Sequence, residues 1–205
     1  MDSVKHFMKL DWLAFKPHQY YLLFSLFPMI SVFTIKSVAP LFSAATAAMM
    51  AFAIFARFFA SEEKSGMARL YGLLPISKKD VVMGRYMNCI IMGLGCIFVS
   101  ALLLGLCTAF IPEIKFSDVV LYYSIFFGVF LICSAIQLPI MFKLGYIKGQ
   151  LPAMILPLLA FYAFIFVKPL IKLQSDLAVI LALAGLLCLV ISMRISIAIC
   201  ANKEV

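Results

Sequence analysis

The chain has 205 residues, of which 65% are hydrophobic and 13% are charged, with a formal net charge of +8. Soluble domains average about 45–50% apolar and about 25% charged residues, so a soluble fold of this size could not bury so much apolar surface. The long runs are apolar on every side and do not alternate, which excludes a β-barrel and predicts an all-α integral membrane protein.

Residues 1–18 are predicted to form an amphipathic helix on the membrane surface. Val4, Phe7 and Leu10 lie near helical spacing, and Trp12 suits the membrane interface. A frayed tail is the alternative. Acids and bases precede the first apolar run and no small-residue cleavage site follows it, so we expect that run to stay in the mature protein.

Six apolar runs approach the roughly 20 residues that a helix needs to cross a bilayer. They lie at residues 19–35, 40–60, 86–110, 118–141, 150–167 and 176–199. Little chain remains outside them, so 1–205 is predicted to be a single transmembrane domain with six spans. Pro28, Pro139 and Pro157 lie inside spans, and each is expected to kink or break its helix.

Basic residues gather on one side of this predicted topology. That side carries Lys5, Lys9, Lys16, Arg57, Lys64, Arg69, Lys78, Lys79, Arg85, Lys143, Lys148, Arg194 and Lys203, and the other side carries Lys36, Lys115, Lys168 and Lys172. The bias predicts that both termini and the segment 61–85 are cytoplasmic. The positive charge is then a topology signal with some attraction to membrane lipid, and it requires no nucleic-acid partner.

Residues that could carry chemistry are scarce inside the spans. There is no paired Asp, no Ser with a base, no HExxH motif, and no acid placed at mid-membrane for an ion-coupled carrier. The six cysteines form no CxxC pair and are expected to be packing residues. We therefore predict no catalytic residue, metal site or cofactor in this chain.

Two polar side chains inside the spans are candidates for a transport pathway, Asn88 and Gln137. Gln137 lies two residues before Pro139 and could line a pathway. The alternative for Gln137 is a hydrogen bond between helices.

The segment SEEKSGMARLYGLLPISKKDVVMGR, residues 61–85, interrupts the apolar runs. Ser61 can cap a helix start, and the acids Glu62 and Glu63 favour the positive end of a helix dipole. Leu74 precedes Pro75, which ends that helix because a residue before proline avoids the α region. The first part is thus predicted to be a short cytoplasmic helix.

A second helix start follows at once. Ser77 and Asp80 match the [ST]xx[DE] capping box, so Ser77 is expected to cap a helix that continues into the span at 86–110. The segment would present a mixed-charge surface joined rigidly to a span, which suits transmission of force from a soluble partner. A solvated loop is the alternative.

These residues resemble the loop between spans 2 and 3 of small ABC-2 type transporter permeases. That loop has an acid pair, a Leu-Pro turn and a basic cluster. The matching residues here are Glu62, Glu63, Leu73, Leu74, Pro75, Ile76, Ser77, Lys78, Lys79 and Arg85. The six-span layout and the interfacial helix are similar too. Within this family, the chain most resembles the permeases of bacterial amphipathic-peptide exporters, such as those for phenol-soluble modulins.

The resemblance implies that transport and ATP hydrolysis are carried out by different chains. This chain has no GxxxxGK[ST] motif, so ATP and Mg²⁺ would be held by a separate nucleotide-binding ATPase subunit. The implied ATPase-coupling residues are Glu62, Glu63, Lys64, Arg69, Tyr71, Leu74, Pro75, Ile76, Ser77, Lys78 and Lys79. Residues 1–18 would be the connecting helix and residues 157–176 a broken or re-entrant region. A second permease copy is expected to complete a homodimer, and pairing with a related permease is the alternative.

The sequence is thus interpreted as a permease of a bacterial cell-membrane exporter that moves an amphipathic or hydrophobic substrate, expected to be a peptide. The alternative is a membrane-integral sensor or assembly subunit that uses the same loop to bind a soluble partner without transport. An intramembrane enzyme is disfavoured because catalytic groups are missing.

Overall fold

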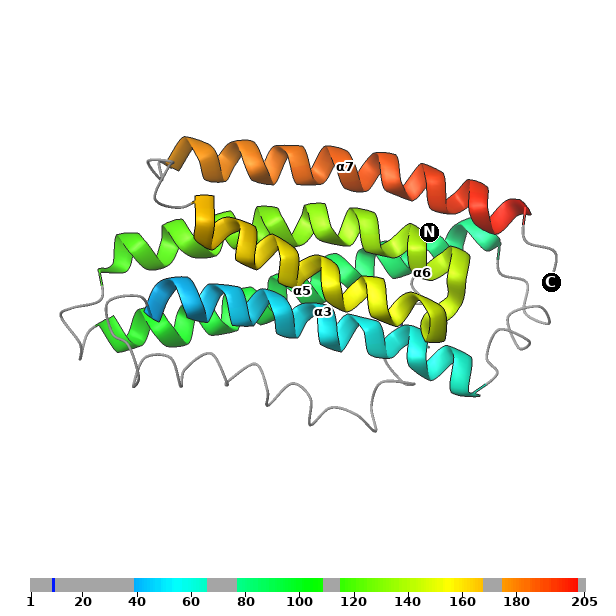
Figure 1. The fold of residues 1–205 in the computed structure, drawn as a ribbon, viewed down its shortest axis with the longest axis horizontal. Helices are drawn as coiled ribbons and strands as arrows, with labels where there is room; N and C mark the ends of the chain where they lie inside the picture. Colours follow the sequence, from blue (N-terminus) through cyan, green and yellow to red (C-terminus); the bar gives the residue numbers. More distant parts are fainter. Residues whose placement is uncertain (1–8, 10–38, 66–76, 109–114, 168–174, 203–205) are drawn as a thin grey trace.

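The computed structural model describes residue 9 and residues 39–65, 77–108, 115–167 and 175–202, and this part of the chain is helical and contains no strand. The long helices are α3 (Ala39–Ser65), α5 (Lys78–Thr108), α6 (Phe116–Val167) and α7 (Ser175–Asn202). They lie lengthwise beside one another (Figure 1). Four stretches within them are long and apolar enough to cross a membrane.

The six predicted spans are therefore confirmed only in part. The candidate spans are Ala39–Ala60, Lys78–Cys107, Phe116–Pro152 and Asp176–Asn202. The predicted interfacial helix at 1–18, apart from Lys9, and the predicted first span at 19–35 lie outside the described residues. The run predicted at 150–167 is helical, but its apolar helix Met154–Phe164 is shorter than a span.

Helix α6 reverses direction at Gly145, where φ is 78° and ψ is 178°. We call residues 116–144 its first arm and residues 146–167 its second arm. The second arm folds back along the first (Figure 1), and the Phe126 ring lies 5.0 Å from the ring of Phe164. The two arms correspond to the runs predicted at 118–141 and 150–167.

Pro139 and Pro157 are each expected from the sequence to kink or break a helix, and the break is wrong. Both lie inside α6, where Gly145 is the residue with non-helical backbone angles. Proline has a φ that fits a helix and removes one hydrogen bond, whereas this reversal needs a positive φ that residues with a Cβ rarely adopt. The break therefore falls on the glycine.

One end of the bundle is where α3 ends at Ser65, α5 begins at Lys78, α6 reverses at Gly145 and α7 ends at Asn202. We call this the charged end; it lies on the right in Figure 1. The described basic residues nearest to it are Arg57, Lys64, Lys78, Lys79, Arg85, Lys143, Lys148 and Arg194, whereas Lys115 lies at the opposite end.

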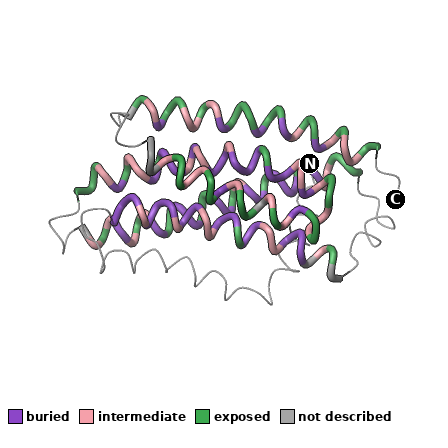
Figure 2. Tube along the Cα trace, viewed as in Figure 1, coloured by how far each residue is buried: buried purple, intermediate pink, exposed green. Residues whose placement is uncertain are grey.

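Helix α6 is central because it contacts α3, α5 and α7. On α3, small residues permit close packing, and Ala44, Ala47, Ala48 and Ala51 are all buried. Against α7, an added Cβ at Gly128 or at Gly185 would lie 2.7 Å from a side chain of the other helix, so the glycines set this close approach. Helix α7 is the most exposed along its length (Figure 2).

Candidate functional site

The acid pair Glu62 and Glu63 lies in the last turn of α3, which continues without a break to Ser65. The prediction that Ser61 starts a new helix is therefore wrong. Both carboxylates lie at the negative end of a helix dipole, which is unfavourable unless other groups compensate them. Each finds such a group on another helix.

Glu62 pairs with Arg85 of α5. The Arg85 Nη2 lies 2.8 Å from the Glu62 Oε2, and Arg85 is 1% exposed while the Glu62 side chain is 23% exposed. The guanidinium carbon also lies 4.8 Å from the centre of the Phe59 ring, one turn earlier on α3. Arg85, matched by the resemblance to a basic cluster, is thus a buried link between α3 and α5.

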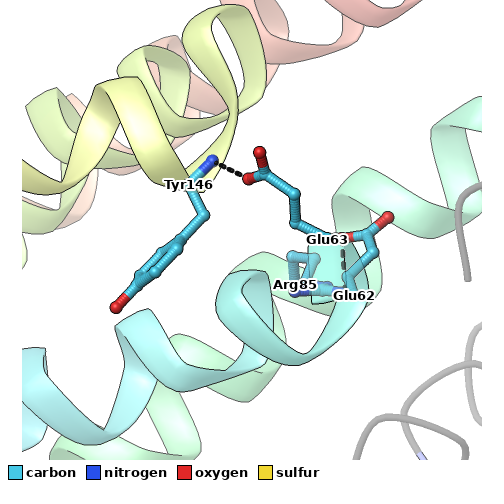
Figure 3. A network of polar contacts seen from close by, with 4 residues as sticks. All are labelled: Glu62, Glu63, Arg85 and Tyr146. Carbon is cyan, nitrogen blue, oxygen red and sulfur yellow. Dashed lines mark hydrogen bonds and ion pairs between the residues drawn. The ribbon is translucent and has the colours of Figure 1, made fainter. Parts of the chain in front are cut away.

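Glu63 binds the start of the second arm of α6 (Figure 3). The backbone N–H groups of Tyr146 and Ile147 donate to the Glu63 Oε2 at 2.7 and 3.2 Å. After the reversal at Gly145 these amides are the free donors of a new helix start, and a carboxylate is well suited to accept from them. Glu63 is an N-cap supplied from 83 residues earlier in the chain.

The capping role predicted for Ser77 is confirmed. The Asp80 N–H donates to the Ser77 Oγ at 3.1 Å, and α5 begins at the next residue, Lys78. Ser77, Lys78 and Lys79 are exposed. The other predicted coupling residues are divided: Lys64 lies in α3, while Arg69, Tyr71, Leu74, Pro75 and Ile76 lie outside the described residues.

A cavity of about 280 Å³ opens beside these contacts at the charged end. It is lined by Glu62 and Glu63 of α3, Val81 of α5, Gly145 and Tyr146 of α6, and Cys200 of α7, among others. All four long helices therefore meet around one site that includes both acids.

The two candidate pathway residues differ in their placement. Asn88 is fully buried on α5. Gln137 is 2% exposed and lines a second cavity, of about 360 Å³, between α3 and both arms of α6. The structure thus places Gln137, and not Asn88, at the wall of this cavity.

Sequence reasoning missed a buried hydroxyl cluster between α5 and α7. The Tyr86 hydroxyl lies 2.6 Å from the Ser192 Oγ and 2.8 Å from the Ser196 Oγ, and Ser192 donates to the Ala135 carbonyl. Ser192 and Ser196 are four residues apart on one helix face, the one signal that could have indicated a shared partner. Nothing in the sequence identifies Tyr86 as that partner.

Within the described residues no group of His, Cys, Asp and Glu is arranged to hold a metal ion. The cysteines there are spread over the helices and do not gather at one place: Cys89, Cys96, Cys107, Cys133, Cys188 and Cys200. The arrangement at the charged end is one of ion pairing and capping, which fixes helices relative to one another.

A family model described as ABC-2 family transporter protein matches residues 6–201, nearly the whole chain. The chain belongs to this ABC-2 family. No curated protein and no solved structure gives a significant match. ABC-2 permeases are membrane components of transport and not themselves catalytic, and membership implies an ATPase partner in general.

Proposed function

We propose that this ABC-2 family chain is the permease subunit of an exporter in a bacterial cell membrane, driven by a separate ATPase that binds ATP and Mg²⁺. Its termini and its charged end face the cytoplasm, two copies form the transport unit, and the substrate is amphipathic or hydrophobic, with a peptide as the leading candidate. The bias of basic residues toward the charged end supports the orientation.

The observation that carries the proposal is the pair of contacts made by Glu62 and Glu63. They join the end of α3 to the buried Arg85 of α5 and to the amides that follow Gly145 in α6. The predicted ATPase-coupling residues 74–77, here called the docking turn, come in the sequence between Ser65 and Lys78, the ends of the helices so joined. A push or pull on this turn would therefore act on α3, α5 and both arms of α6 together.

This assignment divides the predicted coupling residues into two roles. Leu74, Pro75, Lys78 and Lys79 are proposed to contact the ATPase, since Lys78 and Lys79 are exposed at the charged end. Glu62 and Glu63 are proposed to transmit the movement within the permease, because their carboxylates are engaged by other helices.

Affinity purification of the tagged full-length chain from native membranes in mild detergent tests the proposal. The wild-type chain should recover a P-loop ATPase. Leu74→Ala combined with Pro75→Ala should lower that recovery about fivefold, the effect of losing roughly 1 kcal/mol of binding free energy. Lys115→Gln, at the opposite end, is the matched control and should recover as much ATPase as the wild type.

Recovery of a soluble partner that is not an ATPase would reject the transport function in favour of a sensor or assembly role. Undiminished ATPase recovery by the Leu74→Ala, Pro75→Ala variant would reject the docking turn and leave the transport function standing.

A further inference from the structure

The cavity of about 360 Å³ between α3 and the two arms of α6 is lined mainly by apolar side chains, and its few polar residues lie toward the charged end. Arg57, Gln137 and Gln150 lie within about 12 Å of the charged end, at 1.5 Å of rise per helical residue. Met49 and Leu158 line the deeper part, toward the middle of the bundle. This gradient matches a molecule with a polar head and an aliphatic tail.

Gln137 gives an independent sign of a ligand. The residue is 2% exposed, and its Oε1 atom has no hydrogen-bond partner within the described part of the chain. Buried side-chain oxygens almost always accept a hydrogen bond, because leaving one unpaired away from water is costly. Because the Oε1 atom itself is buried, a bound molecule with an O–H or N–H group at this depth would supply the donor once the Gln137 amide turns toward the cavity.

The size of the cavity suits a single aliphatic chain. A protein cavity of about 150 Å³ holds one benzene molecule. By proportion, a cavity of about 360 Å³ holds roughly 14 carbon atoms, about one extended acyl chain.

Access and charge identify the source of that chain. Ala53, Met154 and Leu158 line the cavity and are themselves exposed on the bundle surface, where lipid surrounds a spanning protein. Arg57 supplies a cation that suits a phosphate. In the proposed orientation the charged end lies at the cytoplasmic leaflet, which is the leaflet that holds anionic lipids.

We propose that this cavity binds one acyl chain of an anionic glycerophospholipid whose head group carries a hydroxyl. Arg57 contacts the phosphate, the head-group hydroxyl donates to the Gln137 Oε1, and the acyl chain lies between Met49 and Leu158. Binding requires neither ATP nor a partner chain, so its test is separate from the test of transport.

Native mass spectrometry of the full-length chain in mild detergent, with phosphatidylglycerol or phosphatidylcholine added, tests the site. The wild type should retain more phosphatidylglycerol. Arg57→Gln should lower this retention about fivefold, the factor expected for one basic residue at an anionic head group. Gln137→Leu, of similar size and without the amide, should lower it as well. Dodecyl phosphate should compete, and glycerol phosphate, which lacks the chain, should not.

Matched controls separate this site from general attraction to lipid. Lys148→Gln removes an exposed charge from the same end, and Ser124→Ala alters the separate cavity between α6 and α7. Both should retain phosphatidylglycerol like the wild type. If Gln137→Leu fails to fold, Ala53→Phe, which fills the cavity from the surface, should abolish retention.

Wild-type retention by Arg57→Gln and Ala53→Phe overturns the site. An equal loss in Lys148→Gln also overturns it, since retention would then follow surface charge alone.

Discussion

Arg85 holds a positive charge in an interior position, 1% exposed, with the Glu62 carboxylate 2.8 Å from its Nη2. Taking a charge out of water is expensive, and a partner of opposite sign offsets this cost only when the geometry is close. The pair therefore contributes little to the net free energy of folding. Its main effect is to fix one arrangement of α3 against α5. Removing one partner leaves the other in an unfavourable place.

Glu62→Gln is expected to destabilise the chain by about 2–3 kcal/mol, below the roughly 3–5 kcal/mol of a fully buried pair. The reduction follows from the 23% exposure of the Glu62 side chain, which lets water screen the pair. The measurement is a denaturant titration of the free energy of unfolding in detergent micelles.

The double variant Glu62→Gln, Arg85→Met should recover part of that loss, because it also removes the buried charge. A double variant less stable than Glu62→Gln alone would show that Arg85 stabilises the fold through groups other than Glu62.

At the scale of helices, Gly145 determines the topology of α6. Its φ of 78° with ψ of 178° lies in a region open to glycine and strained for residues with a Cβ. The Glu63 carboxylate closes the reversal by accepting the amides of Tyr146 and Ile147. Turn and cap together place the second arm against the first.

Gly145→Ala should lower the free energy of unfolding by about 1–3 kcal/mol, because alanine must hold a strained backbone. Gly95→Ala is the matched control: its added Cβ meets nothing within 4 Å, so it should stabilise helix α5 by about 0.5–1 kcal/mol. Denaturant titration of both variants gives the comparison. Equal effects of the same sign would contradict the assignment of strain to Gly145.

A helix start can be predicted from the sequence when the capping residue and its partner lie a few residues apart. The prediction fails when the partner of a side chain lies far along the chain. Ser77 is recognisable as a cap because its acceptor role involves Asp80, three residues on. Glu62 and Glu63 resemble a helix start by the same local rule, yet their partners lie 23 and 83 residues further along the chain. The prolines in the sequence predict helix breaks, whereas the reversal of α6 depends on one glycine, Gly145.

For the molecule as a whole, composition alone predicts the membrane class, and the ABC-2 family match over residues 6–201 agrees with the resemblance of segment 61–85. Gln137 is recognisable in the sequence as a polar residue inside an apolar span, but the cavity it lines depends on how α3 and the arms of α6 pack. Such cavities arise from the assembled bundle and leave no local pattern in the sequence.

The central claim is that the charged end is the surface that receives an ATPase. The most direct test places a photo-crosslinking amino acid at exposed Lys79, or at exposed Phe116 on the opposite end, in the full-length chain in native membranes. The account predicts that illumination links position 79, and not position 116, to a P-loop ATPase. An ATPase adduct at 116, or none at 79 while the ATPase co-purifies, would contradict it.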